Sequence, residues 1–377
     1  MEDFYLNKYA EIILKRGLNL QKGDVLSINT EEENSEFAHL VAKAAHDITG
    51  LGVFINYIKD GKVEDTEEAM TEFPINKRPS ALLHIPTYKS YEDIDLDKEY
   101  SARELQAYRL LSEPLTNQTP STPYATAYLP SQSWDDEEID LNSSSLLSEV
   151  FSLEEDDVLS SMKDSADILN YEKNKLNNLN LVKGRIYSEE GVDLEFEFLP
   201  HSHFETSEEI TTNGRKFIPT LFTTELFRAL DKNKTNGYLN ITKPIMLFGK
   251  KLANLSIAFR NGRITEFSAL EDNGKLFDLF LKQDSNALFA SELIIAEENN
   301  NDVDFFALPE WDRMRGCALT LGGARAKGLS DEDIDKLNVS LVTLTLPIHS
   351  STLTIECEDD KGCEYTILED GILTEED

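Results

Sequence analysis

The N-terminal part of the chain alternates between helical and strand-like hydrophobic patterns. YLNKYAEIILKRG carries apolar residues at helical spacing and ends at Gly17. SEFAHLVAKAAHDITG is an amphipathic helix, for which we predict Ser35 as the N-cap and Gly50 as the stop. DVLSINT, GVFINYI and residues 80–86 are apolar runs of strand length. Strand, helix and strand in this order predict βαβ units and a mostly parallel sheet.

The pattern changes twice further along the chain. Residues 114–145 are rich in Pro, Ser and Thr, which is typical of a linker, although YATAYLP contains a short apolar strand. Residues 145–177 are acidic and have a helical pattern. After residue 180 the chain consists of strand-like runs joined by turn residues, with one helix at NGKLFDLFLKQD. This second half is therefore predicted to be β-rich and antiparallel.

Length and pattern together predict two domains, because 377 residues exceed what one ordinary core accommodates. Residues 1–180 are expected to form an α/β domain with a parallel-type sheet and an acidic helical segment. Residues 181–377 are expected to form a β-rich antiparallel (α+β) domain.

Charge and cysteine content narrow the class of protein. The chain has 36 Lys and Arg against 71 Asp and Glu, a formal net charge of −35, which disfavours nucleic acid and anionic membrane surfaces as partners. No signal peptide and no apolar stretch of ~20 residues is evident. Three cysteines, Cys317, Cys357 and Cys363, fit a reducing compartment, although a pair across the loop between Cys357 and Cys363 stays open. We predict a cytoplasmic protein.

Motifs of known chemistry are missing from the sequence. The six histidines are scattered and show no HExxH spacing, and neither a phosphate-binding glycine loop nor a GxSxG elbow occurs. One strand-like run, NVSLVTLTL, raises a question of its own. Since strand side chains alternate between faces, Thr343 and Thr345 share one face and Val342, Leu344 and Leu346 the other.

Four segments carry a resemblance to a known family. They are LNKYAEIILKRGLNLQKGDVLSINT, GRKFIPTLFTTELFRAL, KPIMLFGKKLANLSIAFRNGRITEFSAL and FLKQDSNALFASELIIAEENN. In these segments the chain resembles the thermophilic-type metallo-aminopeptidases, that is, aminopeptidase T and its aminopeptidase S relatives. The resemblance implies an N-terminal α/β domain, a β-rich catalytic domain, a homodimer around an internal chamber, and a peptide ligand.

The resemblance also implies a pair of divalent metal ions held by two Glu, two His, a Tyr and an Asp. Carried over by position, the two Glu are Glu225 and Glu292. The other four positions have changed: the His positions are Ala318 and Thr343, the Tyr position is Arg325 and the Asp position is Thr345.

Two carboxylates that face one site without a cation would repel each other. Arg325, together with Arg313, is therefore predicted to supply the positive charge, since a guanidinium binds a carboxylate through two parallel hydrogen bonds. The alternative is that these arginines are solvated loop charges and that the glutamates are surface acids.

Two functions remain open from sequence. The first is a pseudo-enzyme that has lost dinuclear metal catalysis, binds no metal cofactor and serves in peptide binding or protein interaction. The second is an active metallo-aminopeptidase with a single-metal or rebuilt site that uses Zn, Co or Mn. A homodimer without nucleic-acid or membrane partners is expected in both cases.

Overall fold

The computed structural model describes most of the chain, with gaps. The described residues are 2–59, 62–72, 75–86, 120–129, 147–148, 151–221, 225–242, 244–247, 250–269, 272–296, 316–326, 329–340 and 342–374.

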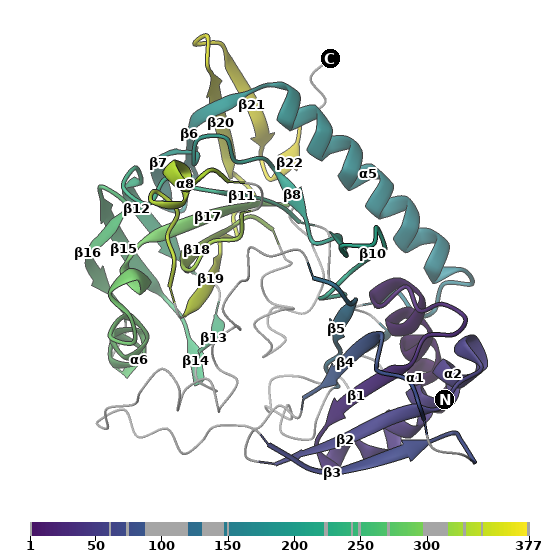
Figure 1. Ribbon diagram of the computed structural model, residues 1–377. Helices are drawn as coiled ribbons and strands as arrows, with labels where there is room; N and C mark the ends of the chain where they lie inside the picture. The colour runs from purple at the N-terminus through teal and green to yellow at the C-terminus, as the bar shows by residue number, and fades with distance from the viewer. Residues whose placement is uncertain are drawn as a thin grey trace. The chain divides into compact units, whose positions relative to one another are not determined.

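The chain forms two compact units (Figure 1). Of the described residues, the first unit takes those up to 86, those from 120 to 167, and 207–221. The second takes 168–206 and those from 225 onward. The division falls inside a long helix, α5 (Val158–Asn178). The single boundary predicted at residue 180 stays a prediction, to which the structure adds that residues 207–221 pack with the first unit.

The first unit is built on a five-stranded sheet with the strand order β3-β2-β1-β4-β5. Strands β2, β1, β4 and β5 run parallel, and β3 is an antiparallel edge strand. Its elements are α1 (Glu2–Ile12), the π-helix η1 (Ile13–Gly17), β1 (Leu26–Thr30), η2 (Glu32–Asn34), α2 (Ser35–Thr49), β2 (Val53–Lys59), β3 (Lys62–Ala69), β4 (Ala81–Ile85), β5 (Tyr124–Thr126), β9 (Glu209–Ile210) and β10 (Lys216–Phe217).

Helix α2 connects the parallel strands β1 and β2, as the βαβ pattern predicts. It ends at Gly50, which adopts the left-handed conformation with φ 71° and so confirms the predicted stop. Ser35 is not the N-cap, which corrects the prediction: the helix begins at Ser35 itself, after the short 3-10 turn η2. The Ser35 hydroxyl instead lies 3.2 Å from the Tyr57 hydroxyl.

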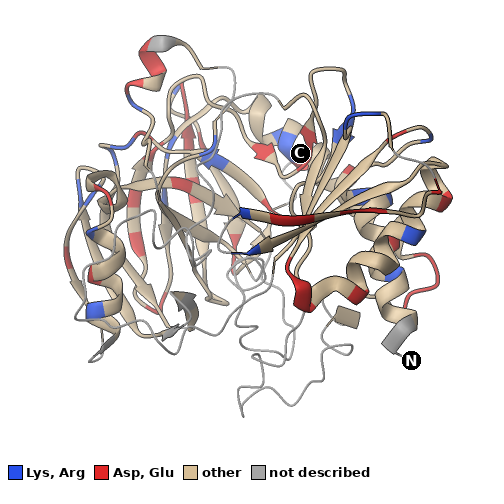
Figure 2. Ribbon diagram, turned by 60° about the horizontal axis from the view of Figure 1, so that its bottom comes forward, with Lys and Arg blue, Asp and Glu red and all other residues tan. Residues whose placement is uncertain are grey.

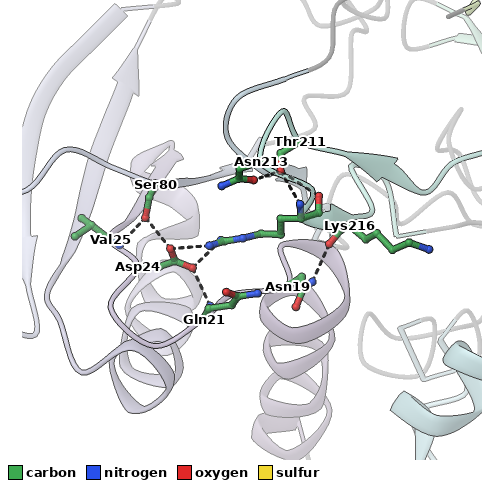
Figure 3. A network of polar contacts seen from close by, with 9 residues as sticks. Asn19, Gln21, Asp24, Val25, Ser80, Thr211, Asn213 and Lys216 are labelled. Atoms are coloured by element: carbon green, nitrogen blue, oxygen red, sulfur yellow. Dashed lines mark hydrogen bonds and ion pairs between the residues drawn. The ribbon is translucent and has the colours of Figure 1, made fainter.

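A buried ion pair fastens the short hairpin β9–β10 to the rest of the first unit (Figure 3). Arg215 donates from both terminal nitrogens to the Asp24 carboxylate, at 2.7 and 3.1 Å. The same carboxylate accepts from the Gln21 backbone N–H and the Ser80 hydroxyl. Asn19 adds a second contact by donating to the Lys216 carbonyl.

The second unit contains a five-stranded sheet, β19-β18-β17-β11-β8, and an eight-stranded sheet, β16-β15-β12-β7-β6-β20-β21-β22. Every strand pairing in both sheets is antiparallel, as predicted. The elements are β6 (Leu181–Tyr187), β7 (Asp193–Glu197), β8 (Glu205–Thr206), β11 (Leu226–Ala229), β12 (Asn236–Ile241), β13 (Ile245–Leu247), β14 (Lys250–Leu252), β15 (Leu255–Arg260), β16 (Arg263–Ser268), α6 (Asp272–Leu281), η4 (Ser285–Leu288), β17 (Ala290–Ile295), β18 (Ala318–Gly322), α8 (Asp331–Ile334), β19 (Thr343–Pro347), β20 (Thr354–Asp359), β21 (Glu364–Glu369) and β22 (Ile372–Leu373).

The main core of the second unit lies between these two sheets and helix α6. Leu194 and Ile257 come from the eight-stranded sheet, Leu293 and Leu319 from the five-stranded one, and Phe277 from α6. The alternation of apolar and polar residues along each strand places one face of each sheet in this core. The opposite face of the five-stranded sheet lies outside this core.

One prediction in this half needs correction, and the possible disulfide that the sequence left open is not formed. The helical pattern assigned to residues 145–177 continues as α5 only from Val158, because residues 152–157 form turns. The hairpin register pairs Cys357 with Tyr365 rather than with Cys363, so the geometry does not favour a disulfide. Both thiols are free, and Cys357 is buried while Cys363 is exposed.

Acidic residues are spread over the helices and strands of both units rather than gathered on one element (Figure 2). Among the helices that the structure describes, none is long and apolar enough to cross a membrane.

Candidate functional site

The five-stranded sheet of the second unit separates the main core from a polar face. Strand alternation directs Leu293, Leu319 and Leu344 into the core. On the opposite face Glu292, Thr320 and Thr345 occupy paired positions across β17, β18 and β19. The threonine face predicted from NVSLVTLTL therefore lies in the same row as one of the two glutamates.

The other positions singled out from sequence lie on or beside this face. Ala318 precedes Thr320 by two residues, and Thr343 precedes Thr345 by two, so each shares its neighbour's face. The Thr320 and Thr345 hydroxyl oxygens are 3.4 Å apart. Glu225 stands immediately before β11, which pairs with β17 on its other edge.

Arg325 lies between the two glutamates. Its Nη1 donates to Glu225 Oε1 at 3.2 Å, and its Nη2 donates to Glu292 Oε1 at 2.5 Å. Its Nε lies 3.1 Å from both Glu292 oxygens, and its backbone N–H donates to Glu292 Oε2 at 3.1 Å. Both carboxylates are buried, with side chains 1% and 2% exposed, whereas the Arg325 side chain is 21% exposed.

The environment of the guanidinium favours its charged form. Its Cζ lies 3.5 Å from the centroid of the Phe227 ring, a cation–π contact, and Phe227 packs with Ile294 and Ala318 in a small apolar cluster. Burial opposes the charge, but the Glu292 and Glu225 carboxylates hold the pKa of Arg325 above its ordinary value. The site thus consists of one guanidinium paired with two carboxylates and packed against an apolar cluster.

A glycine turn brings Arg325 back over the sheet. Gly322 ends β18 with φ +88°, and a Cβ at this position would lie 2.0 Å from the Val342 carbonyl oxygen. Only glycine tolerates both the conformation and the close approach. Gly323 and Ala324 then donate to the carbonyls of Val342 and Asn338, which positions the loop that carries Arg325.

The remaining candidates contribute less. Arg313 lies outside the described residues. Cys317 is buried in the main core, and its thiol donates to the Ala296 carbonyl, so it is a packing residue. Within the part of the chain that the structure describes, no group of three or more His, Cys, Asp or Glu side chains is placed to hold a metal ion.

Comparison with known proteins shows the family to which the chain belongs. The model of the thermophilic metalloproteases (M29) matches residues 2–372. The chain belongs to this family. It is 23% identical to Aminopeptidase 2 of Geobacillus stearothermophilus and 23% identical to Aminopeptidase PepS of Streptococcus thermophilus, with 97% of each chain covered in both comparisons.

A solved structure shows the same fold. AmpT from Thermus thermophilus superposes with a TM-score of 0.77 at 16% sequence identity, covering 99% of this chain and 100% of that one. This match confirms the predicted fold class, an α/β unit together with a β-rich antiparallel unit. The further statement that four metal-ligand positions have been replaced stays a prediction.

Two contributors to the site were missed from sequence. The sequence around Phe227 predicts a strand, but it gives no sign that the ring contacts a distant guanidinium. Thr320 completes the polar row between Glu292 and Thr345, and the alternation of ALTLG could have indicated it.

Proposed function

We propose that this chain is a member of the M29 family that does not carry out dinuclear metal-dependent hydrolysis. The observation that supports this most directly is the Arg325 guanidinium between Glu225 and Glu292. A metal ion bound by these two carboxylates would have to share their oxygens with a resident positive charge, which Coulomb repulsion opposes.

The chemistry of the surrounding residues supports the same proposal. Ala318 has no donor atom for a metal, and the hydroxyls of Thr343 and Thr345 are weak ligands compared with imidazole or carboxylate. The residues present therefore do not fit the ligand set that the resemblance implies. We accordingly propose no bound metal cofactor.

The role that remains for such a scaffold is a binding role. The relatives are named as aminopeptidases, which act at peptide ends, so a peptide ligand or a protein partner is the class we propose. The homodimer and the cytoplasmic location stay predictions.

The test is a search for metal-dependent peptidase activity with a matched variant. The purified chain is assayed on aminoacyl chromogenic substrates and on unblocked peptides, with Co²⁺, Zn²⁺ or Mn²⁺ added after chelation. We expect no metal-dependent release of N-terminal residues. Activity that depends on metal and is lost in Glu225→Ala would overturn the proposal in favour of an aminopeptidase with a single-metal or rebuilt site. Metal-dependent activity that is lost in Glu292→Ala would overturn it equally. Activity that survives in both variants would come from a contaminant and leave the proposal standing.

A further inference from the structure

The face of the eight-stranded sheet that points away from the main core carries a hollow, where β16, β15 and β12 lie side by side (Figure 1). Its volume is about 340 Å³. Strand alternation directs six side chains of these strands into it, whereas their neighbours Leu239 and Ile257 belong to the core. The six are Tyr238, Asn240, Ser256, Ala258, Glu266 and Ser268.

One row of paired residues runs through this hollow and beyond it. Tyr187, Asp193, Tyr238, Ala258 and Glu266 stand opposite one another on the successive strands β6, β7, β12, β15 and β16. Neighbouring strands lie about 4.8 Å apart, so the backbones of Tyr238 and Glu266 stand about 10 Å apart, with the Ala258 methyl group between them. The row therefore has a gap that is flanked by an aromatic ring and a carboxylate.

At the other end of the row, the chain fills the same combination of groups with an arginine of its own. Arg185 donates from Nε and Nη2 to the two carboxylate oxygens of Asp193, at 2.7 and 2.9 Å. Its Cζ lies 5.1 Å from the centroid of the Tyr187 ring, a cation–π contact. A tyrosine and an acid on this row therefore hold one guanidinium by stacking and by two parallel hydrogen bonds.

The corresponding tyrosine and acid in the hollow have no such cation. Within the described part of the chain, no Lys or Arg forms an ion pair with Glu266 or lies over the Tyr238 ring, which is 67% exposed. The two cations of the β15–β16 hairpin, Arg260 and Arg263, stand at its turn. The gap in the row is thus open to a cation from another molecule.

The lining of the hollow selects for charge. Asn240 donates to the Glu190 carbonyl at 3.0 Å and accepts from the Ser256 hydroxyl at 2.9 Å, so these polar groups are engaged within the chain. Among the described lining residues, Glu266 is the only charged one. The net charge of −35 attracts cations to the surface as a whole. A flat cation is therefore the ligand that fits the ring, the carboxylate and the small floor together.

We propose that this hollow binds the side chain of an arginine in a polypeptide partner, with its guanidinium stacked on Tyr238 and paired with Glu266. A guanidinium suits the hollow better than an ammonium, because it is planar and donates two parallel hydrogen bonds to one carboxylate. The inference goes beyond the proposed function and does not depend on it, because the hollow lies on the eight-stranded sheet and Arg325 on the five-stranded one.

The experiment follows the Ala258 methyl signal by NMR in the full chain labelled with ¹³C-methyl alanine; the signal is identified by its absence in A258S. The probes are N-acetyl-arginine amide, N-acetyl-lysine amide and N-acetyl-citrulline amide, which has the shape of arginine without its charge. Because each contact is weak at an exposed site, the titrations extend into the millimolar range at constant ionic strength.

Three variants locate the binding. Y238A removes the ring and E266Q the charge of the hollow. The matched control is E195Q, which removes one charge from β7 on the same face of the sheet, outside the hollow. We expect a saturable shift of the Ala258 methyl signal with the arginine probe, weakened about threefold by Y238A and by E266Q and unchanged by E195Q. The lysine probe should bind more weakly, and the citrulline probe should give no saturable shift.

Each opposite result overturns the inference. If the arginine probe gives no saturable shift, or the citrulline probe gives an equal one, the hollow does not recognise a guanidinium. If the lysine probe binds as tightly, or E195Q weakens binding as much as E266Q, only the general surface charge attracts the probe. If the signal shifts with protein concentration alone, a second copy of the chain covers the hollow. None of these results bears on metal-dependent hydrolysis, so the proposed function would stand.

Discussion

Two arginines lie on opposite faces of the same five-stranded sheet, and they are held in opposite ways. Arg325 lies on the polar face between two carboxylates. Arg228, within β11, points into the main core, where it donates to the Ser202 hydroxyl and the Leu181 carbonyl at 3.0 Å each. Both therefore carry a buried or largely buried guanidinium, but only one is compensated by negative charge.

The compensation decides the direction of the pKa. Burial lowers the pKa of Arg228 to about 10, and its guanidinium is 4.2 Å from the Phe198 ring rather than beside an acid. Burial also opposes the charge of Arg325, yet two carboxylates raise its pKa. Arg215 is an intermediate case, since it is buried against the single carboxylate of Asp24. We infer that the cost of losing each arginine follows the number of carboxylates it leaves behind.

Removing Arg325 should have the largest effect. R325A leaves two buried carboxylates without their cation, so we expect a loss of about 3–5 kcal/mol in the free energy of unfolding. Denaturant unfolding at pH 7 measures it. R325K, which keeps the charge but not the forked geometry, should lie between the native chain and R325A. A loss below about 1 kcal/mol would mean that the ion pairs contribute little.

Removing Arg215 should come next. R215M leaves Asp24 with hydrogen bonds from Gln21 and Ser80, so the loss should be smaller, about 2 kcal/mol. Because burial is outweighed by Arg215 and the other donors, the pKa of Asp24 lies below its ordinary value of 3.8. A carboxyl with a lowered pKa contributes stability above that ordinary value and loses it as the pH falls through the folded-state value.

This sign gives R215M a pH signature. In the variant, Asp24 keeps the hydrogen bonds from Gln21 and Ser80 but loses the guanidinium, so its pKa should lie above that in the native chain. The difference in stability between R215M and the native chain is therefore full at pH 7 and narrows as the pH falls below about 4. Urea unfolding at several pH values follows the gap. A gap that stays constant from pH 7 to pH 3 would show that Arg215 stabilises the hairpin by packing rather than by charge.

Removing Arg228 should have little effect. R228M has a similar volume and avoids burying an uncompensated charge, so the loss of two hydrogen bonds and the gain in desolvation should nearly cancel, within about 1 kcal/mol in either direction. Equilibrium unfolding compares the variant with the native chain. A loss above about 3 kcal/mol would reverse the ranking on which the comparison of the three arginines rests.

Local patterns explain which parts of this fold could be predicted from sequence. Gly50 ends α2 because the helical periodicity stops there, and Thr343 and Thr345 share a face because strands alternate. Both facts are local. The edge strand β3 was missed because its sequence, KVEDTEEA, is too charged to suggest a strand. An edge strand exposed to water tolerates such charges, and the composition then hides the structure.

Contacts between distant residues could be predicted only where chemistry demanded them. Asp24 and Arg215 are 191 residues apart, and nothing in their surroundings pairs them. Within LFRAL, Arg228 would be expected to be an exposed charge. Adjacent strand residues point to opposite faces, however, so Phe227 lies on one face of the sheet and Arg228 points into the core on the other. The contact of Arg325 with Glu225 and Glu292 was different, because two acids expected at one site required a cation.

The weakest member of the series is a surface pair in the first unit, where His39 Nε2 lies 3.1 Å from Glu67. The Ser35 carbonyl, opposed by partial burial and assisted by Glu67, raises the pKa of His39 above its ordinary 6.5. A cation with a raised pKa adds stability below 6.5 and loses it as the pH rises through the folded-state value. Because both side chains are about 40% exposed, E67Q should lower the free energy of unfolding by about 0.5 kcal/mol or less at pH 6, and by less at pH 8.

Salt tests the same pair against the buried one. At 1 M salt the stability difference between E67Q and the native chain should vanish, while the loss in R325A persists, because salt screens exposed charges and affects buried ones much less. If 1 M salt reduced the stability loss of R325A as much as that of E67Q, burial would not protect the ion pairs of Arg325 from screening.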